Sequence, residues 1–202
     1  MPANLGAHET MELHEILTHS IDSINQLQLY RPHVRDSQLK NILDNQINFV
    51  SQEYNNMVNA ISQRGRGEAV PYRKIGNVSP SYGLRNPGSV APNISADELD
   101  DRDIASGMLG MHKSSAVMKM TASLEFADPL LRRMIQQGAM NCSEQAFEVW
   151  NYMNQKGYYQ VPTMKEMTTE TVINTFQPAH TGQVGHMGYM SHSHVGQTGH
   201  IS

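Results

Sequence analysis

The stretch HETMELHE, residues 8–15, places two histidines and three glutamates within eight positions. Imidazole nitrogens and carboxylate oxygens are ligands that zinc takes in proteins. On a helix, His8, Glu12, Glu15 and His19 fall on one stripe, because side chains three or four positions apart are neighbours. This stretch could therefore hold a catalytic metal, hold a structural metal, or form a solvated or partner-binding face.

An apolar stripe on the same predicted helix helps to separate these alternatives. It consists of Leu13, Leu17, Ser20 and Ile24, and it lies on a different face from the histidine and glutamate stripe. The ligand-type residues are therefore expected on the flank of a bundle, where acidic groups also suit the positive end of the helix dipole. A solvated or docking face is favoured, a surface zinc ion is the alternative, and a catalytic metal is the least supported reading.

The helices that would position these groups come from an internal repeat. Segment 36–65 recurs as segment 128–157, and each copy begins with an aspartate able to cap a helix and ends with a basic residue and glycine. Identical residues recur at one constant offset: Asp36/Asp128, Leu39/Leu131, Ser51/Ser143, Asn59/Asn151, Gln63/Gln155 and Gly65/Gly157.

Apolar residues at helical spacing predict helices over 36–64 and 128–156. Similar stripes predict preceding helices over 9–30 and 98–126. The pattern from Ser95 to Glu98 predicts a capping box at the start of the last of these.

Short joins make the two helices of each pair antiparallel, so residues 7–65 and 95–161 predict two helical hairpins. The connection 66–94 is rich in proline and glycine and is long for a link inside a compact domain. A bundle whose second and third helices run parallel needs such a link, because the chain must travel its whole length. The predicted fold is therefore all-α, a ferritin-like four-helix bundle over 7–161 built from two hairpins and a long crossover. Two independent hairpins on a flexible linker are the alternative.

A ferritin-like di-metal site requires carboxylates from two helices and a Glu-x-x-His motif from each of the other two. The predicted helices 36–64 and 128–156 contain no such motif. Gln46, Glu53 and Gln145 are the deep polar positions, and we expect them to form a hydrogen-bonded polar layer in the core. No catalytic residue and no cofactor are expected.

Two further expectations concern single residues of this layer and its surroundings. Glu144 and Glu148 fall off the apolar stripe of their helix and are not expected in the core. Replacing Glu53 with leucine is expected to be nearly neutral or stabilising if the partners of Glu53 can form other hydrogen bonds.

Composition excludes several function classes. The net charge is −4 and no basic stripe is present, so nucleic acid is not an expected partner. No apolar run approaches the roughly 18 residues of a membrane span, and no secretory signal is expected at the N-terminus. The single cysteine, Cys142, cannot form an internal disulfide, and on a buried stripe without a basic activator it is expected to be a core residue.

The C-terminal part of the chain differs in composition. Residues 162–176 predict a short helical extension. Residues 177–202 are rich in histidine and glycine and predict a disordered tail, in which His192 and His194 are weak candidates for metal binding.

Two motifs and the hairpin–linker–hairpin plan resemble the bacterial spore coat protein F family. The motifs are HETMELHE at 8–15 and YMNQKGYYQVPTMKEM at 152–167. The resemblance implies a ferritin-like bundle made in the mother-cell cytoplasm and deposited in the spore coat, with no established enzymatic role. Other spore coat proteins are the implied partners, and a homo-oligomer is left open. A ferritin-like metalloprotein, either a metal store or a relative of manganese catalase, is the alternative, and the missing Glu-x-x-His pairs argue against it.

Overall fold

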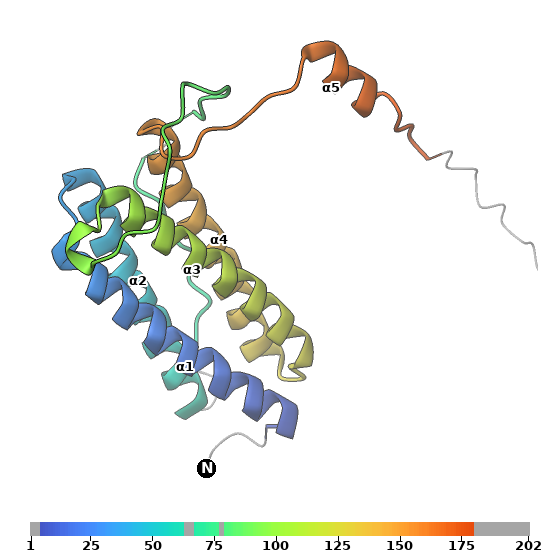
Figure 1. Ribbon diagram of the computed structural model, residues 1–202. Coiled ribbons are helices and arrows are strands. Elements are labelled where there is room, and N and C mark those ends of the chain that lie inside the picture. The colour runs from blue at the N-terminus through green and yellow to red at the C-terminus, as the bar shows by residue number, and fades with distance from the viewer. Residues whose placement is uncertain (1–4, 63–66, 77–78, 180–202) are drawn as a thin grey trace, which may run out of the picture. The chain divides into compact units, whose positions relative to one another are not determined.

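A computed structural model describes residues 5–62, 67–76 and 79–179 of the chain (Figure 1). The contacts divide the chain into two units, Met1–Thr163 and Met164–Ser202. The predicted disordered tail falls mostly outside the described residues.

The first unit contains four long helices: α1 (Ala7–Tyr30), α2 (Ser37–Ser62), α3 (Asp101–Ala122) and α4 (Pro129–Gln155). Short 3₁₀ turns follow α1 and α3 and precede α3, at Arg31–His33, Ser123–Glu125 and Ala96–Glu98. The second unit contains α5 (Glu166–Ile173). The described ranges contain no strand, and their isolated β-bridges join Tyr82 and Gly83 to Val161.

Each helix of the first unit packs mainly against two others. α1 contacts α2 and α3, and α4 contacts the same two helices. In Figure 1, α1 and α2 form one antiparallel pair and α3 and α4 form a second, with α2 and α3 running in the same direction. The segment between α2 and α3, which we call the crossover, therefore returns along the length of the helices.

The apolar core draws on all four helices at both ends of the unit. One cluster contains Leu27, Leu39, Ile104 and Val149, and the other contains Leu13, Met57, Ala122 and Leu131. These side chains lie at the helical spacing that predicted the four elements, and burying each of the larger ones contributes about 1.5–3 kcal/mol.

The ends of α4 agree with the predicted caps. Asp128 accepts hydrogen bonds from the amides of Leu130 and Leu131 at 2.8 and 2.9 Å. At the other end, Gly157 has a φ of 76°, and the amide of Tyr158 donates to the carbonyl of Met153 at 2.8 Å. This left-handed glycine closes the helix as expected, whereas Gly65, its counterpart in the repeat, lies outside the described residues.

The predicted start of α3 was wrong. Ser95 accepts from the amide of Asp97 and caps only the short 3₁₀ turn, after which Leu99 takes an extended conformation. α3 begins after Asp100, whose side chain accepts from the amides of Arg102 and Asp103. Aspartates and glutamates crowd this segment, so capping patterns overlap, and only the packed helix determines which of them forms.

Candidate functional site

Glu9, the second residue of the opening motif, joins two parts of the fold. Its Oε1 accepts hydrogen bonds from the amides of Ala127 and Asp128, both at 2.8 Å, and its Oε2 accepts from the amide of Gly6 at 2.6 Å. These bonds, the one from Asp128 first, lower the pKa of Glu9. The carboxylate thus ties the start of α1 to the start of α4, a contact that the sequence pattern did not reveal because it joins distant segments.

The other members of the motif do not converge. His8 is exposed and lies 3.7 Å from Glu125, and Glu15 is exposed and lies 3.4 Å from His14. Glu12 is half-buried. Among the described residues, no group of three or more histidine, cysteine, aspartate or glutamate side chains could hold a metal. His192 and His194 lie outside the described residues.

His19 differs from its expected place on the solvent flank. It is half-buried, and its Nε2 lies 2.7 Å from Oγ of Ser115 on α3. Burial first, and then the charge of Lys119, lower the pKa of His19. His19 therefore belongs to the interface between α1 and α3.

An ion pair between a buried lysine and a partly exposed glutamate joins α3 to α2. Nζ of Lys119 on α3 donates to Oε2 of Glu53 on α2 at 2.6 Å, and only 6% of the lysine side chain is exposed. Burial lowers the pKa of Lys119, but Cys142 and Glu53 raise it by more, so the net direction is upward. Burial raises the pKa of Cys142, and Glu53 is the carboxylate that Lys119 bonds directly.

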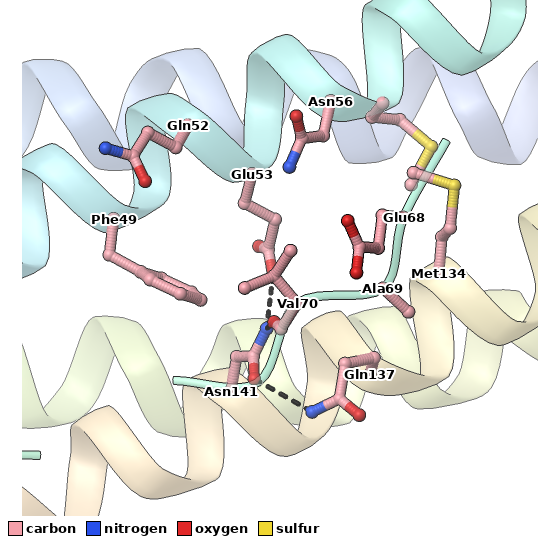
Figure 2. Close-up of a pocket in the computed structure, with 11 residues that line it drawn as sticks. Phe49, Gln52, Glu53, Asn56, Glu68, Ala69, Val70, Met134, Gln137 and Asn141 are labelled. Carbon is pink, nitrogen blue, oxygen red and sulfur yellow. Dashed lines mark hydrogen bonds between the residues drawn. The ribbon is translucent and has the colours of Figure 1, made fainter. Parts of the chain in front are cut away.

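Glu53 also borders a small cavity between α2, the crossover and α4, where Figure 2 shows Glu53 and Asn141 facing each other. Asn141 donates to Oε1 of Glu53 at 2.7 Å, and Gln137 donates to Asn141 at 2.9 Å. The cavity measures about 40 Å³. That volume suits roughly three water molecules, which is too little for a substrate of many atoms. Its lining is Phe49, Gln52, Glu53, Asn56, Met57, Glu68, Ala69, Val70, Met134, Gln137 and Asn141.

Gln46 is the centre of a second buried polar group. Its Nε2 donates to Oε2 of Glu148 at 3.0 Å and to the carbonyl of Gln145 at 3.2 Å. Its Oε1 lies 2.8 Å from Nε2 of His112. Because an amide oxygen can only accept, this nitrogen of His112 carries the proton. Burial first, and then the charge of Lys119, lower the pKa of His112 to about 3.

The low pKa of His112 predicts acid sensitivity. The unfolded chain protonates this histidine near pH 6.5, whereas the folded chain does so only near pH 3. The unfolded state therefore binds more protons between these values, and stability should fall as the pH drops through that window, by up to about 1.4 kcal/mol per pH unit. Urea unfolding of the wild type and of His112→Gln across this range measures the effect, and the variant should show a shallower slope. Parallel curves would contradict a neutral buried His112.

Gln145 corrects an expectation. The side chain is fully buried, but neither its Nε2 nor its Oε1 has a hydrogen-bond partner among the described residues. The expected bonds from Gln145 to side chains of other helices are therefore not formed, and its backbone carbonyl, not its amide, bonds to Gln46.

Polar side chains on one face of α4 fasten the crossover. Asn141 accepts from the amide of Tyr72 at 2.8 Å and donates to the carbonyl of Val70 at 2.9 Å. Asn154, further along α4, accepts from the amide of Ser81 at 2.8 Å and donates to its carbonyl at 3.0 Å. Each asparagine side chain thus accepts from a backbone amide and donates to a backbone carbonyl of the crossover. In an extended segment these backbone groups would otherwise need a neighbouring strand as partner.

Glu148 lies between these two asparagines and was wrongly placed outside the core. It is 4% exposed, because the crossover covers it. Its carboxylate accepts from the Tyr72 hydroxyl and from the amide of Ile75, both at 2.5 Å. The crossover is thus docked through the buried Tyr72 side chain and the backbone amide of Ile75, although most of its described side chains, that of Ile75 included, are exposed.

An aromatic row lies on the outer side of α4. The rings of Phe147 and Trp150 stack with centroids 5.8 Å apart, and Tyr159 meets Trp150 edge-on at 5.9 Å. Lys74 lies 4.7 Å from the Phe147 ring, and Lys113 lies 5.4 Å from the Tyr159 ring. Phe147 and Tyr159 are each 39% exposed, so the row presents aromatic surface of the kind that is enriched at protein interfaces.

Comparisons with known proteins identify the family to which the chain belongs. The Coat F domain family model matches residues 100–162, which cover α3, α4 and the segment after them. The chain is 33% identical over 177 residues to the spore coat protein F-like protein YhcQ of Bacillus subtilis (strain 168), covering 86% of this chain and 81% of that protein. No solved structure matches significantly.

The fold and these matches define a helical spore coat protein. The chain belongs to the spore coat protein F family, which confirms the resemblance read from the two motifs and places the protein in the spore coat. No helix in the described part of the chain is long and apolar enough to cross a membrane.

Proposed function

We propose that this protein is a structural component of the spore coat that acts through contacts with other coat proteins, and that its four long helices form a ferritin-like bundle. The observation that carries the proposal is that the inner carboxylates bind other parts of the same chain. Glu9, Glu53 and Glu148 are each held by bonds that join separate parts of the chain. The surface, in contrast, carries the histidine and glutamate flank and the aromatic row.

Exposed apolar side chains on α3 and on the 3₁₀ turn that follows it support the same function. Val117, Met120 and Leu124 are 69%, 40% and 65% exposed and follow one another at helical spacing. Together with the aromatic row on α4, they form the type of surface that associates with other proteins.

A ferritin-like metalloprotein remains the alternative function, and the buried lysine argues against it. Nζ of Lys119 lies 2.6 Å from Glu53, a carboxylate of the core polar layer expected from the sequence. An ammonium group at that position repels a cation and occupies its space.

Incorporation into the coat tests the proposal. One variant replaces His8 and Glu15 with alanine, and a second lacks residues 177–202. Both should keep wild-type helicity by circular dichroism yet appear in coat extracts at levels several-fold below the wild type, because weak multivalent contacts lose avidity together. The control replaces Asn25 and Gln28, which are exposed on the same helix, and should be incorporated normally.

Two results would contradict the proposal. Undiminished incorporation of both variants would show that neither the flank nor the tail is a docking surface. Turnover of peroxide or ferrous iron by the purified tail-deleted protein, with manganese or iron supplied, would favour the metalloprotein.

A further inference from the structure

The two hairpins hold each other through equivalent contacts. Glu9, in the first turn of α1, accepts from the backbone amides at the start of α4. Asp101, in the first turn of α3, accepts from the amides of Arg35 and Asp36 at the start of α2, at 2.8–3.2 Å. Glu9 and Asp101 stand at the same offset as Asp36 and Asp128, so the repeat extends to the first helix of each hairpin.

This reciprocity is the pattern of a two-fold interface. In such an interface the same surface serves both partners, and each contact occurs twice. Here a carboxylate in the first helix of each hairpin accepts hydrogen bonds from the backbone amides at the start of the second helix of the other hairpin. The first unit is therefore organised like a dimer of two hairpins, α1–α2 and α3–α4, joined into one chain by the crossover.

The core layer determines which hairpins can pair. At the repeat offset, Gln145 corresponds to Glu53, and Leu27 corresponds to Lys119. Two first hairpins together would bury the Glu53 carboxylate against leucine. Two second hairpins would bury Lys119 against the neutral Gln145. An unpaired buried charge is strongly destabilising, so a first hairpin accepts only a second hairpin.

We propose that the first hairpin of one copy pairs with the second hairpin of another copy, so that the protein associates with itself by exchanging hairpins. The partner hairpin offers every contact that the chain's own hairpin offers, including the Glu9 and Asp101 bonds. Whether a hairpin pairs within its own chain or with another copy depends on the effective concentration of each partner. A densely packed coat raises the concentration of other copies and so favours exchange. This deepens the proposed function by naming a second copy of the chain as a partner.

The crossover is compatible with this exchange. Its bonds to Asn141, Glu148 and Asn154 attach it to α4 of its own chain from Val70 onward. Gly67 of the crossover lies against Ala60 of α2. Further along, the Tyr72 hydroxyl accepts from the Asn45 side chain at 2.8 Å, and the Tyr72 and Phe49 ring centroids are 4.9 Å apart. An α2 helix from another copy would make the same contacts.

Charge reversal in the full-length protein tests the proposal. Glu53→Lys alone buries two ammonium groups, and Lys119→Glu alone buries two carboxylates, so each variant should be much less stable than the wild type. When the two are refolded together at equal amounts, exchange brings the two substituted side chains together in one bundle and restores the pair of Glu53 and Lys119 in the other. The mixture should then form a dimer whose urea midpoint approaches that of the doubly substituted chain.

Two controls keep the result decisive. Arg31 and Asp44 pair at 2.6 Å within the first hairpin, on an exposed surface, so a mixture of Arg31→Asp and Asp44→Arg should unfold at the urea midpoint of its components. The doubly substituted chain, Glu53→Lys with Lys119→Glu, shows whether the reversed pair is tolerated.

A second measurement uses wild-type protein alone. Two differently tagged wild-type chains, refolded together at high concentration, should give a mixed dimer that survives dilution for as long as the helices remain folded. A mixture of the charge variants no more stable than its components, alongside a stable doubly substituted chain, would overturn the proposal. So would a wild-type protein that stays monomeric at every concentration. Neither readout depends on coat incorporation, so this inference and the proposed function can fail separately.

Discussion

Replacing Glu53 with leucine is expected to destabilise the protein by about 3–5 kcal/mol, because Lys119 is then left buried without its countercharge. The lysine side chain is 6% exposed and its Nζ lies 2.6 Å from the Glu53 carboxylate. Asn141 would also lose its bond to Oε1 of Glu53. The near-neutral outcome expected from the sequence assumed that the partners of Glu53 could bond elsewhere, and a buried ammonium group cannot.

The double substitution Glu53→Leu with Lys119→Met should recover most of that loss. An apolar pair of similar volume removes both desolvated charges, and such replacements are often neutral or stabilising. The free energy of unfolding in urea, measured for both single variants and the double variant, gives the coupling directly. Arg31→Met, which breaks the exposed pair with Asp44, should leave the midpoint nearly unchanged. A double variant as unstable as Glu53→Leu alone would show that packing, and not charge pairing, sets the loss.

The helices themselves could be predicted because their signals are local. The apolar spacing of α2 and α4 and the caps at Asp128 and Gly157 involve residues within a few positions of one another. The start of α3 failed for the same reason, since overlapping local patterns at Ser95 and Asp100 cannot be ranked without the packing that follows.

The buried polar residues could be predicted only in part. Helical spacing placed Gln46, Glu53 and Gln145 on the inner face, and the structure leaves the two glutamines fully buried and Glu53 partly exposed. It could not identify Lys119 or His112, because a long or polar side chain on a helix is normally solvated. Their burial depends on which helix lies opposite, and that information comes from the fold.

The position of Gln145 shows what the repeat contributes. Glu53 retains a carboxylate because Lys119 faces it across the interface between the hairpins. The equivalent of Lys119 is Leu27, so a carboxylate at 145 would be buried without a cation, and a neutral amide stands there instead. Burying a neutral amide without a hydrogen-bond partner costs less free energy than burying a carboxylate without a cation.

Replacing Glu148 with alanine is expected to release the crossover from α4. The carboxylate accepts from the Tyr72 hydroxyl, the Ile75 amide and the Gln46 side chain. Bonds to a charged group contribute about 1.5–3 kcal/mol each, and they are not additive here because the three donors share one carboxylate. We expect a loss of about 2–4 kcal/mol in the free energy of unfolding, together with faster proteolysis between Val70 and Arg85.

Glu144 provides the matched control for this prediction. It lies one turn before Glu148 on the same helix, and neither was expected in the core. Its only described ionic contact is with Lys74, at 3.8 Å on a partly exposed surface, so Glu144→Ala should change the unfolding midpoint little. Limited proteolysis followed by mass spectrometry locates the cleavage sites in both variants. Equal resistance of the crossover in Glu148→Ala and Glu144→Ala would show that Asn141 and Asn154 hold it without the carboxylate. Selective cleavage in Glu148→Ala would show that Glu148 holds the crossover on α4. Helical periodicity placed Glu148 off the core because it carries no information about where the crossover lies.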